Sequence, residues 1–211
     1  MAEKMKGILI TLEGNEGSGK STQIRLLHNY LKKKGRRVFL TREPGGTRVG
    51  DGIRKILLDN RHQKMTAVTE TLLYMASRAQ LVEEVIKPRL KKGQIVLCDR
   101  WLDATLAYQG YGGGVDKKWI ESLGQEVTQG IHPKLSLFLE LPLACGLRRA
   151  RQHKKADRME RKEIGFHKKV RQGYLWIVKA EPRRFKQIKM KEDDGVFFIH
   201  EKIKKAVSNV L

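Results

Sequence analysis

The stretch from Gly14 to Ser21 constrains the fold of this chain more than any other feature. It reads GNEGSGKS and fits the pattern G-x-x-x-x-G-K-S/T. It follows the apolar run 7–12, a predicted buried strand, and opens a helical pattern at Lys20. Glycines let consecutive backbone N–H groups turn inward around an anion, and the N-terminus of a helix adds unpaired donors. This context predicts a loop that holds the phosphates of a nucleotide.

The loop also predicts how the phosphates are held. Lys20 can reach the β- and γ-phosphates, and we expect its side chain to be exposed, serving charge stabilisation rather than packing. The Ser21 hydroxyl is placed to ligate Mg²⁺, and Asp99, which ends a later strand, can hold the same ion directly or through water. The residues predicted to bind ATP are Gly14, Asn15, Glu16, Gly17, Ser18, Gly19, Lys20, Ser21 and Thr22.

Short apolar runs alternate with helical patterns along the rest of the chain. In the first helical pattern, Ile24, Leu27 and Leu31 fall at i, i+3 and i+7. Such alternation predicts an α/β fold with a parallel sheet and helices on both faces, as one domain over residues 1–211. The expected strands are 7–12, 37–41, 94–99, 135–141 and, weakly signalled, 185–189. The expected helices run from Lys20 to about Gly35, up to Leu58, from Val68 to Leu90 with Leu72, Met75, Ala79, Val82 and Ile86 on one stripe, and over 195–210, whose opening "VFFI" also fits a strand.

The composition favours a cytoplasmic protein. With 211 residues, 40% of them hydrophobic and 32% charged, the chain is long enough for one domain with a buried core. No apolar run approaches the roughly 18 residues of a membrane span, and the first residues do not fit a signal peptide. Cys98 and Cys145 lie far apart, so they form neither a metal-ligand pattern nor a disulfide framework.

The net charge is unusually high. Lys and Arg number 44 against 23 Asp and Glu, a formal charge of +21. This balance suits a polyanionic partner, either nucleic acid or nucleotide phosphates. The basic runs 32–37 and 87–93 fall at the ends of predicted helices, where cations favour the helix dipole, so many of these side chains are expected to be ordinary solvated surface.

A phosphate loop alone does not separate a motor, a switch and a kinase. The chain has no Asn-Lys-x-Asp segment for reading guanine, and it is short for a nucleic-acid motor. Arg100 follows Asp99 directly, at the sheet edge where ligands bind, which suggests a second phosphate to clamp and hence a small-molecule kinase. Arg42 ends a strand at the same edge.

Tyr74 and Arg78 lie one turn apart on the predicted middle helix, so they share a face. The ring of Tyr74 suits either stacking on a base or core packing. The guanidinium of Arg78 suits either a phosphate or a surface ion pair with Glu83 or Glu84.

Several stretches carry a family resemblance: "EGNEGSGKST" (13–22), "TREPGGT" (41–47), "LLYMASRAQ" (72–80), "DRWLDATLAYQG" (99–110) and "HPKLSLFLEL" (132–141). With them the chain resembles bacterial thymidylate kinase from end to end. The resemblance implies a three-layer P-loop NTPase-type fold with a five-stranded parallel sheet, transfer of the ATP γ-phosphate to dTMP, a requirement for Mg²⁺, and usually a homodimer.

The resemblance also implies site residues. It places three arginines around the phosphate or base edge of dTMP, an aromatic ring on thymine, and a tyrosine that blocks a 2′-hydroxyl. It places Glu16 at the nucleotide sugar and Pro44 beneath the substrate. The implied acceptor residues are Glu16, Arg42, Pro44, Tyr74, Arg78, Arg100, Thr105, Tyr108 and Gln109.

The segment 148–158 is similar to the mobile lid of the family, within about 146–160. The phosphate loop contains no arginine, yet phosphoryl transfer needs cations besides Lys20 and Mg²⁺. The lid candidates for this charge are Arg151, Arg149 and Arg158, in that order, and the predicted catalytic residues are Lys20, Arg100, Arg151 and Arg149. After the last strand, Lys189 and Met190 depart from the family pattern and leave the adenine contacts open.

Two rival functions remain at this point. One is another nucleotide or deoxynucleoside kinase of the P-loop class. The other is a basic nucleic-acid-binding protein that keeps a nucleotide fold, although no aromatic and basic residues interleave in a base-stacking pattern. The expected partners are dTMP and ATP, with nucleic acid not required and no membrane involved.

Overall fold

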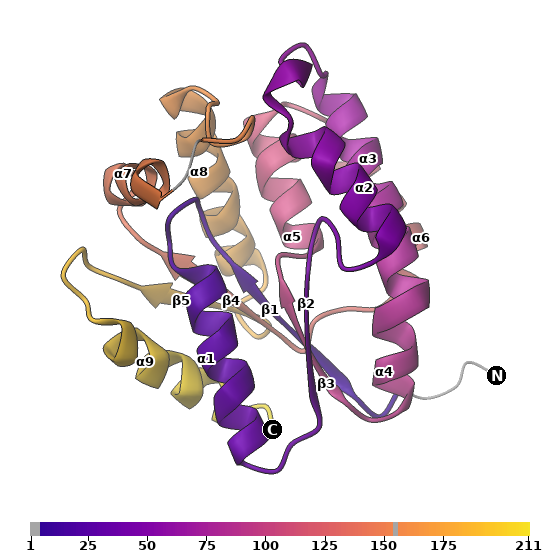
Figure 1. Cartoon of the computed structure of the whole chain (residues 1–211), viewed down its shortest axis with the longest axis vertical. Coiled ribbons are helices and arrows are strands. Elements are labelled where there is room, and N and C mark those ends of the chain that lie inside the picture. The colour runs from indigo at the N-terminus through magenta and orange to yellow at the C-terminus, as the bar shows by residue number, and fades with distance from the viewer. Residues whose placement is uncertain (1–4, 154–155) are drawn as a thin grey trace.

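The computed structural model describes residues 5–153 and 156–211, without the side chains of Arg151 and His153. These residues form an α/β fold around a five-stranded, all-parallel sheet with the strand order β2-β3-β1-β4-β5 (Figure 1). The strands are β1 Ile8–Glu13, β2 Val38–Arg42, β3 Ile95–Asp99, β4 Leu135–Glu140 and β5 Phe185–Lys189. Each predicted strand is confirmed to within one residue at either end.

The helices flank the sheet on both faces. In Figure 1, α1 and α9 lie on one side of the sheet, and α2, α3 and α6 stand together on the right of the view. The α-helices are α1 Lys20–Lys33, α2 Arg48–Leu58, α3 Ala67–Leu81, α4 Lys87–Lys91, α5 Leu102–Thr105, α6 Lys117–Thr128, α7 Leu143–His153, α8 Ile164–Ala180 and α9 Val196–Ser208, with a 3₁₀ turn η1 Asn60–His62 and π-helical segments η2 Val82–Ile86 and η3 Leu106–Gly112.

The long helical stretch expected over 68–90 is confirmed, but it is divided into α3, η2 and α4. Its expected apolar stripe is partly wrong, because Leu72 is 48% exposed and Ala79 is also exposed. The buried face of α3 instead carries Glu70, which pairs with Arg158, and Arg78, which pairs with Glu43. Because charged residues occupy part of the inner face of α3, this face does not follow the apolar stripe that the sequence predicts.

Two apolar clusters hold the helices against the two faces of the sheet. One joins Leu27 of α1 and Ile203 of α9 to Leu137 of β4. The other joins Ile86 of η2 to Val96 of β3. The strands are therefore buried on both sides, and side chains at the carboxyl edge of the sheet are held in place from above and below. No helix in the described ranges is both long and apolar enough to span a membrane.

Candidate active site

A cavity of about 380 Å³ opens at the carboxyl edge of the sheet. Lys20 and Ser21 of the phosphate loop line one end, and Arg42 and Asp99, which end β2 and β3, line its floor. Parallel α/β sheets bind their ligands at this edge. The cavity is also lined by all the residues assigned to the acceptor, namely Glu16, Arg42, Pro44, Tyr74, Arg78, Arg100, Thr105, Tyr108 and Gln109.

The loop after β1 has the backbone shape that its glycines predict. Gly14, Gly17 and Gly19 have φ values of 148°, 67° and 83°, and all three lie in the region that favours glycine. Gly17 has a second constraint, because a Cβ there would lie 2.0 Å from the carbonyl oxygen of Gly146 in α7. The phosphate loop and the first turn of α7 therefore touch backbone to backbone.

Lys20 is buried rather than exposed, so that expectation is wrong. Its side chain folds back over the loop, and Nζ donates to the carbonyl oxygens of Gly14 at 3.0 Å and Asn15 at 2.8 Å, and to Ser18 Oγ at 3.3 Å. Burial, together with the positive Arg100, lowers the pKa of Lys20 to about 8. The ammonium is held within the loop that is built to surround phosphates.

Ser21 and Asp99 fit a magnesium ion. Ser21 Oγ donates to Asp99 Oδ2 at 3.0 Å, so the first turn of α1 and the end of β3 present two oxygen ligands side by side. Mg²⁺ in phosphoryl-transfer sites prefers oxygen ligands, few of them from protein, with the rest from water and substrate phosphates. Among the described residues there is no cluster of three or more His, Cys, Asp or Glu that would suggest a different metal.

Arg100 links the phosphate loop to the other wall of the cavity. Nη2 donates to Glu16 Oε2 at 2.7 Å and to Tyr108 OH at 3.0 Å, and Nη1 donates to the Gly14 carbonyl at 3.0 Å. Its φ is 76°, an uncommon value for a residue with a side chain, and this backbone aims the guanidinium into the site. Burial would raise the pKa of Glu16, but Arg100 and Lys20 outweigh it and the pKa is lowered. Glu16 is therefore an anion at neutral pH.

Arg78 is buried. It does not form a surface ion pair with Glu83 or Glu84, which was one of the two alternatives from the sequence. Nε and Nη2 both donate to Glu43 Oε2, at 2.8 and 2.6 Å, and Nη2 also donates to Thr105 Oγ1 at 3.0 Å. Both side chains of the ion pair are at most 3% exposed. Burial raises the pKa of Glu43 even though Arg78 opposes the shift. The pair fixes Thr105 in the wall of the cavity.

Arg42 and Tyr74 differ from Arg78 in being open to the cavity or to solvent. Arg42 contacts Asp51 at 3.2 Å across the surface, with 56% of its side chain exposed. Tyr74 is half-buried, and burial raises its pKa to about 12, so the ring stays neutral. Arg54, which the sequence did not single out, also lines the cavity and donates to the Pro44 carbonyl at 3.0 Å.

The start of the lid is the basic helix α7. Arg148 pairs with Glu192, and Arg149 Nη2 donates to the Glu192 carbonyl at 2.6 Å. Both contacts lie at the surface, on the loop between β5 and α9. The side chain of Arg151, the first candidate for the transferring phosphate, lies outside the described residues, as do residues 154–155.

The end of the lid is anchored by Arg158. This residue is 1% exposed; Nε donates to the Leu57 carbonyl at 2.8 Å and Nη1 pairs with Glu70. Glu70 Oε2 also accepts from Gln109 Nε2 at 3.2 Å. Arg158 is thus a structural anchor, which leaves Arg149 and Arg151 as the lid candidates for the phosphate.

Residues of the lid end also form part of the cavity wall, which sequence reasoning missed. Asp157, Met159 and Glu160 line the cavity above the anchored Arg158. Tyr174 of α8 was missed as well; it donates to Glu13 Oε2 at 3.0 Å and accepts from Arg100 at 3.2 Å. Nothing in the local sequence pattern around Tyr174 distinguishes it from a core tyrosine.

Comparison with known proteins decides the family. A family model described as thymidylate kinase matches residues 12–203. The chain belongs to the thymidylate kinase family. It is 45% identical over 207 residues to the thymidylate kinase of Caldanaerobacter subterraneus subsp. tengcongensis, with 98% of each chain covered. It is 50% identical over 186 residues to that of Geotalea daltonii, covering 85% of this chain and 87% of the relative.

A solved structure agrees with the fold. The crystal structure of thymidylate kinase from Ehrlichia chaffeensis matches with a TM-score of 0.79 and 32% identity, covering 96% of this chain and 98% of that one. The chain is therefore an ATP-dependent nucleoside monophosphate kinase of the thymidylate kinase family, with a P-loop fold. Its cavity joins the phosphate loop to a wall that contains four arginines, Arg42, Arg54, Arg78 and Arg100.

Proposed function

We propose that this thymidylate kinase transfers the γ-phosphoryl group of MgATP to dTMP, giving dTDP and ADP, within a single domain. One observation carries the proposal: the cavity joins Lys20 and Ser21 of the phosphate loop to a wall that contains four arginines. An acceptor that already bears a phosphate suits such a wall, since arginine's planar fork matches phosphate oxygens.

The reaction places few demands on acid–base groups. A phosphate oxygen of dTMP attacks the γ-phosphorus, the bond to the β,γ-bridging oxygen breaks, and ADP leaves with the electron pair. A phosphate monoester is largely a dianion at pH 7, so the nucleophile needs no general base. Catalysis then rests on positioning and on cations around the transferring group.

Lys20 and Arg100 supply neighbouring cations at the phosphate loop, since both donate to the Gly14 carbonyl at 3.0 Å. Lys20 leaves the loop carbonyls for the β- and γ-phosphates, because a phosphate anion is a stronger acceptor than a neutral carbonyl. Ser21 and Asp99 would hold Mg²⁺, which would offset the negative charge of the phosphates. Arg100 already lies against Glu16 at the loop and against Tyr108 at the acceptor wall, so it is placed between the two substrates.

The acceptor wall orients dTMP. Tyr74 offers a ring for thymine, and Thr105 and Gln109 offer polar atoms for the base edge. Arg42, at the open end of the wall, is available for the dTMP phosphate, and Pro44 shapes the loop beneath it. Tyr108, whose hydroxyl donates to Glu16 at 2.8 Å, would meet a 2′-hydroxyl, which favours a deoxyribose.

Arg149 and Arg151 of α7 complete the charge on the donor side. The contact between Gly17 and Gly146 keeps the start of α7 on the phosphate loop. A modest motion of the rest of the helix would bring one of these arginines over the γ-phosphate and exclude water, which strengthens electrostatic interactions in the site.

We further propose a homodimer formed through α2 and α3. These helices pack on each other and expose Val49, Ile56, Val68 and Leu72, each at least 44% exposed. A second copy of this face would cover the apolar side chains isologously. We also place the protein in the cytoplasm, in keeping with its two free cysteines.

The experiment that tests the function is ADP release with each nucleoside monophosphate at fixed MgATP. dTMP should be the best acceptor, and dUMP poorer by about tenfold, because one methyl contact contributes only about 1–3 kcal/mol. Thymidine should not be phosphorylated, since it brings no phosphate to the arginines. Better turnover of CMP, AMP or thymidine than of dTMP would contradict the proposal.

A further inference from the structure

Exposed basic side chains stand before every strand, at the sheet edge opposite the active-site cavity. Since the sheet is all-parallel, the residues that precede the strands lie along one edge. We call these residues the basal row. In the spatial order β2-β3-β1-β4-β5 they are Arg36 and Arg37, Lys91 and Lys92, Lys6, Lys134, and Arg183.

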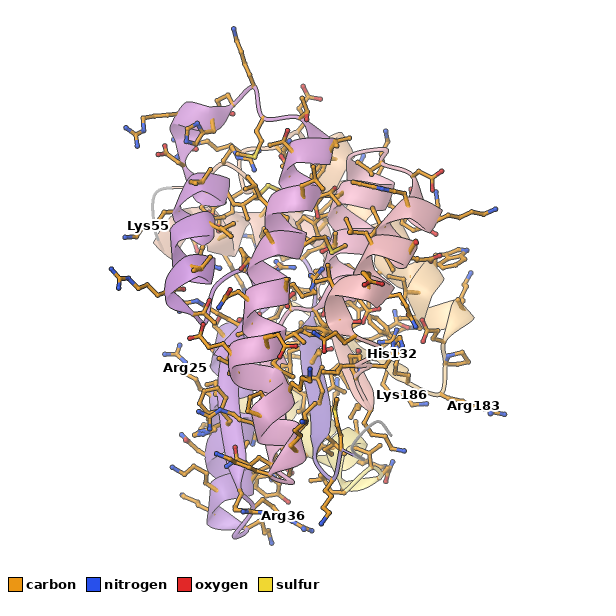
Figure 2. All side chains as sticks on the ribbon, turned by 90° about the vertical axis from the view of Figure 1, so that its right-hand side faces the viewer. Arg25, Arg36, Lys55, His132, Arg183 and Lys186 are labelled. Atoms are coloured by element: carbon orange, nitrogen blue, oxygen red, sulfur yellow. The ribbon has the colours of Figure 1, made fainter. Side chains whose placement is uncertain are left out.

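The basal row is continuous. Strands lie about 4.8 Å apart, so five strand starts span roughly 20 Å. Arg37 Nη2 donates to the Lys92 carbonyl at 2.8 Å, and both Arg37 Nη2 and Lys6 Cβ lie 3.6 Å from the point where a Cβ on Gly93 would stand. These contacts bring the guanidinium of Arg37 and the chain at Lys6 and Lys92 together at three neighbouring strand starts. In Figure 2, Arg36 and Arg183 both lie in the lower half of the molecule.

Helix ends extend the basic surface. Lys32 and Lys33 lie in the last turn of α1, and Lys34 follows them. The ammonium groups of Lys34 and Lys204 lie 6.0 and 5.1 Å from the centre of the Tyr30 ring, so α9 joins the same surface. The positive charge thus covers both the strand starts and the helices packed beside them.

Carboxylates neutralise little of this charge. Glu181 pairs with Arg184, and Glu201 pairs with Lys204. Among the described residues, no carboxylate forms an ion pair with these basal-row side chains: Lys6, Arg36, Arg37, Lys92, Lys134 and Arg183. Six neighbouring cations without counter-charges repel one another, and this arrangement destabilises the fold slightly unless a partner supplies anions.

Neither helix dipoles nor the kinase reaction accounts for the basal row. A cation at a helix C-terminus is favourable, which explains Lys32, Lys33 and Lys91. Lys6 lies two residues before β1 and Lys134 directly before β4, and neither caps a helix. The cavity lies at the other edge of the sheet, so substrate phosphates do not reach these side chains.

We propose that the basal row binds the phosphate backbone of a nucleic acid without reading its bases. A line of cations with strand spacing matches a polymer with repeated phosphates, and such contacts give sequence-independent binding. Tyr30, a half-buried ring at this surface, already contacts the ammonium groups of two lysines and the ring of His200. The bases are therefore not held.

An anionic membrane is the weaker alternative. Peripheral binding to lipid usually combines cations with apolar side chains that insert between headgroups. The large exposed apolar side chains of the described residues lie mostly elsewhere, such as Val49 and Ile56 of α2 and Phe197 in the first turn of α9, at the other end of that helix from Lys204. The basal row itself carries none, so the observations favour nucleic acid.

The test compares two variants with the same change in net charge. The basal variant carries Lys6→Glu, Arg36→Glu, Lys92→Glu and Lys134→Glu. The control variant carries Lys55→Glu, Lys118→Glu, Lys168→Glu and Lys169→Glu, four exposed lysines on α2, α6 and α8. In Figure 2, Lys55 lies in the upper half of the molecule, away from Arg36. Turnover of dTMP at the parent rate confirms that both variants are folded.

Fluorescence anisotropy with a labelled oligonucleotide of about 20 nucleotides, single-stranded or duplex, measures binding across a salt series. At about 100 mM salt the basal variant should lose at least ~10-fold in affinity and the control variant less than ~3-fold. The slope of log K against log salt should also become shallower in the basal variant, by about 0.9 for each phosphate contact that is lost. Equal losses in the two variants, or no binding by the parent, would overturn the proposal. So would tighter binding to phosphatidylserine vesicles or inorganic polyphosphate than to the oligonucleotide.

Discussion

Two arginines of the acceptor wall differ from the arginines of the lid helix in how they are held. Arg78 and Arg100 are already paired with Glu43 and Glu16 inside the protein. Arg148 and Arg149 of α7 instead make surface contacts with the loop that contains Glu192. The buried part of the acceptor wall is therefore held in place without substrate, whereas the described arginines of α7 are held only by surface contacts.

This difference suggests a division of labour between the two regions. Buried pairs fix geometry, because leaving either partner uncompensated is costly. Surface contacts are weak and easily exchanged, which is what a moving element requires. The acceptor wall should thus govern dTMP binding and stability, and α7 should govern the rate of phosphoryl transfer.

Lys20 lies in the phosphate loop, outside both regions, and its removal should have the largest effect. Lys20→Ala should lower kcat by at least ~10³-fold, because the transferring phosphoryl group loses its fixed cation. The fold should survive with a small fall in Tm, since the lost hydrogen bonds go to loop atoms. Steady-state kinetics and thermal unfolding measure both effects, and activity within tenfold of the parent would contradict a phosphate-loop role.

Stability separates the acceptor wall from the lid most directly. Arg78→Ala leaves the Glu43 carboxyl buried without its partner and should cost about 3–5 kcal/mol in the free energy of unfolding. Arg149→Ala removes only a surface hydrogen bond and should cost less than about 1 kcal/mol. Urea unfolding of both variants provides the comparison, and equal costs would show that the two regions are held alike.

The lid arginines should affect the rate of phosphoryl transfer. Neutralising Arg149 and Arg151 together should lower kcat by at least ~10-fold with little change in dTMP affinity, because their charge acts on the transferring group. The single variants should be non-additive if either arginine substitutes for the other. A matched control is Arg148→Ala, on the same helix and paired with Glu192. If the double variant turns over at the parent rate, the arginines of α7 are only solvated surface residues.

The smallest expected effect is a change in the pH profile. In the free enzyme Lys20 has a pKa of about 8, so its positive charge is present at pH 7 and is lost as the pH rises. kcat/KM for ATP should therefore fall above pH 8, approaching tenfold per unit. kcat should hold to higher pH, because bound phosphates favour the charged ammonium and raise its pKa.

Lys20→Arg is the control for this profile, since arginine stays charged throughout the range. The variant should lose the alkaline fall in kcat/KM, whatever its overall rate. An unchanged alkaline limb would assign the titration to another group.

Much of the fold could be predicted from the sequence because its signals are local. A buried parallel strand such as 94–99 is a continuous apolar run, and the glycines of 14–19 mark a loop that few conformations satisfy. The short α5 and the π-helical η3 had no such signal, since a wide helical turn around Tyr108 and Gly110 follows neither period.

The candidate site was predictable where residues end strands or belong to motifs, as for Arg42 and Arg100. The burial of Lys20 and Arg78 was not, because it depends on partners far along the chain, such as Glu43 for Arg78. The same holds for Arg158, whose partner Glu70 lies 88 residues away. Pairing between charges that lie far apart in the chain leaves no local sequence pattern. The binding roles of these residues remain predictions.

The contact between Gly17 and Gly146 has a consequence for anyone who grafts a lid from one relative onto another. A Cβ on Gly146 would stand 2.4 Å from the Glu16 carbonyl oxygen, a backbone atom that cannot rotate away. A transplanted helix that brings any larger residue to this position must lift off the loop, however well its arginines match. The phosphate loop and the first turn of α7 must therefore be exchanged together, with glycine retained at both Gly17 and Gly146.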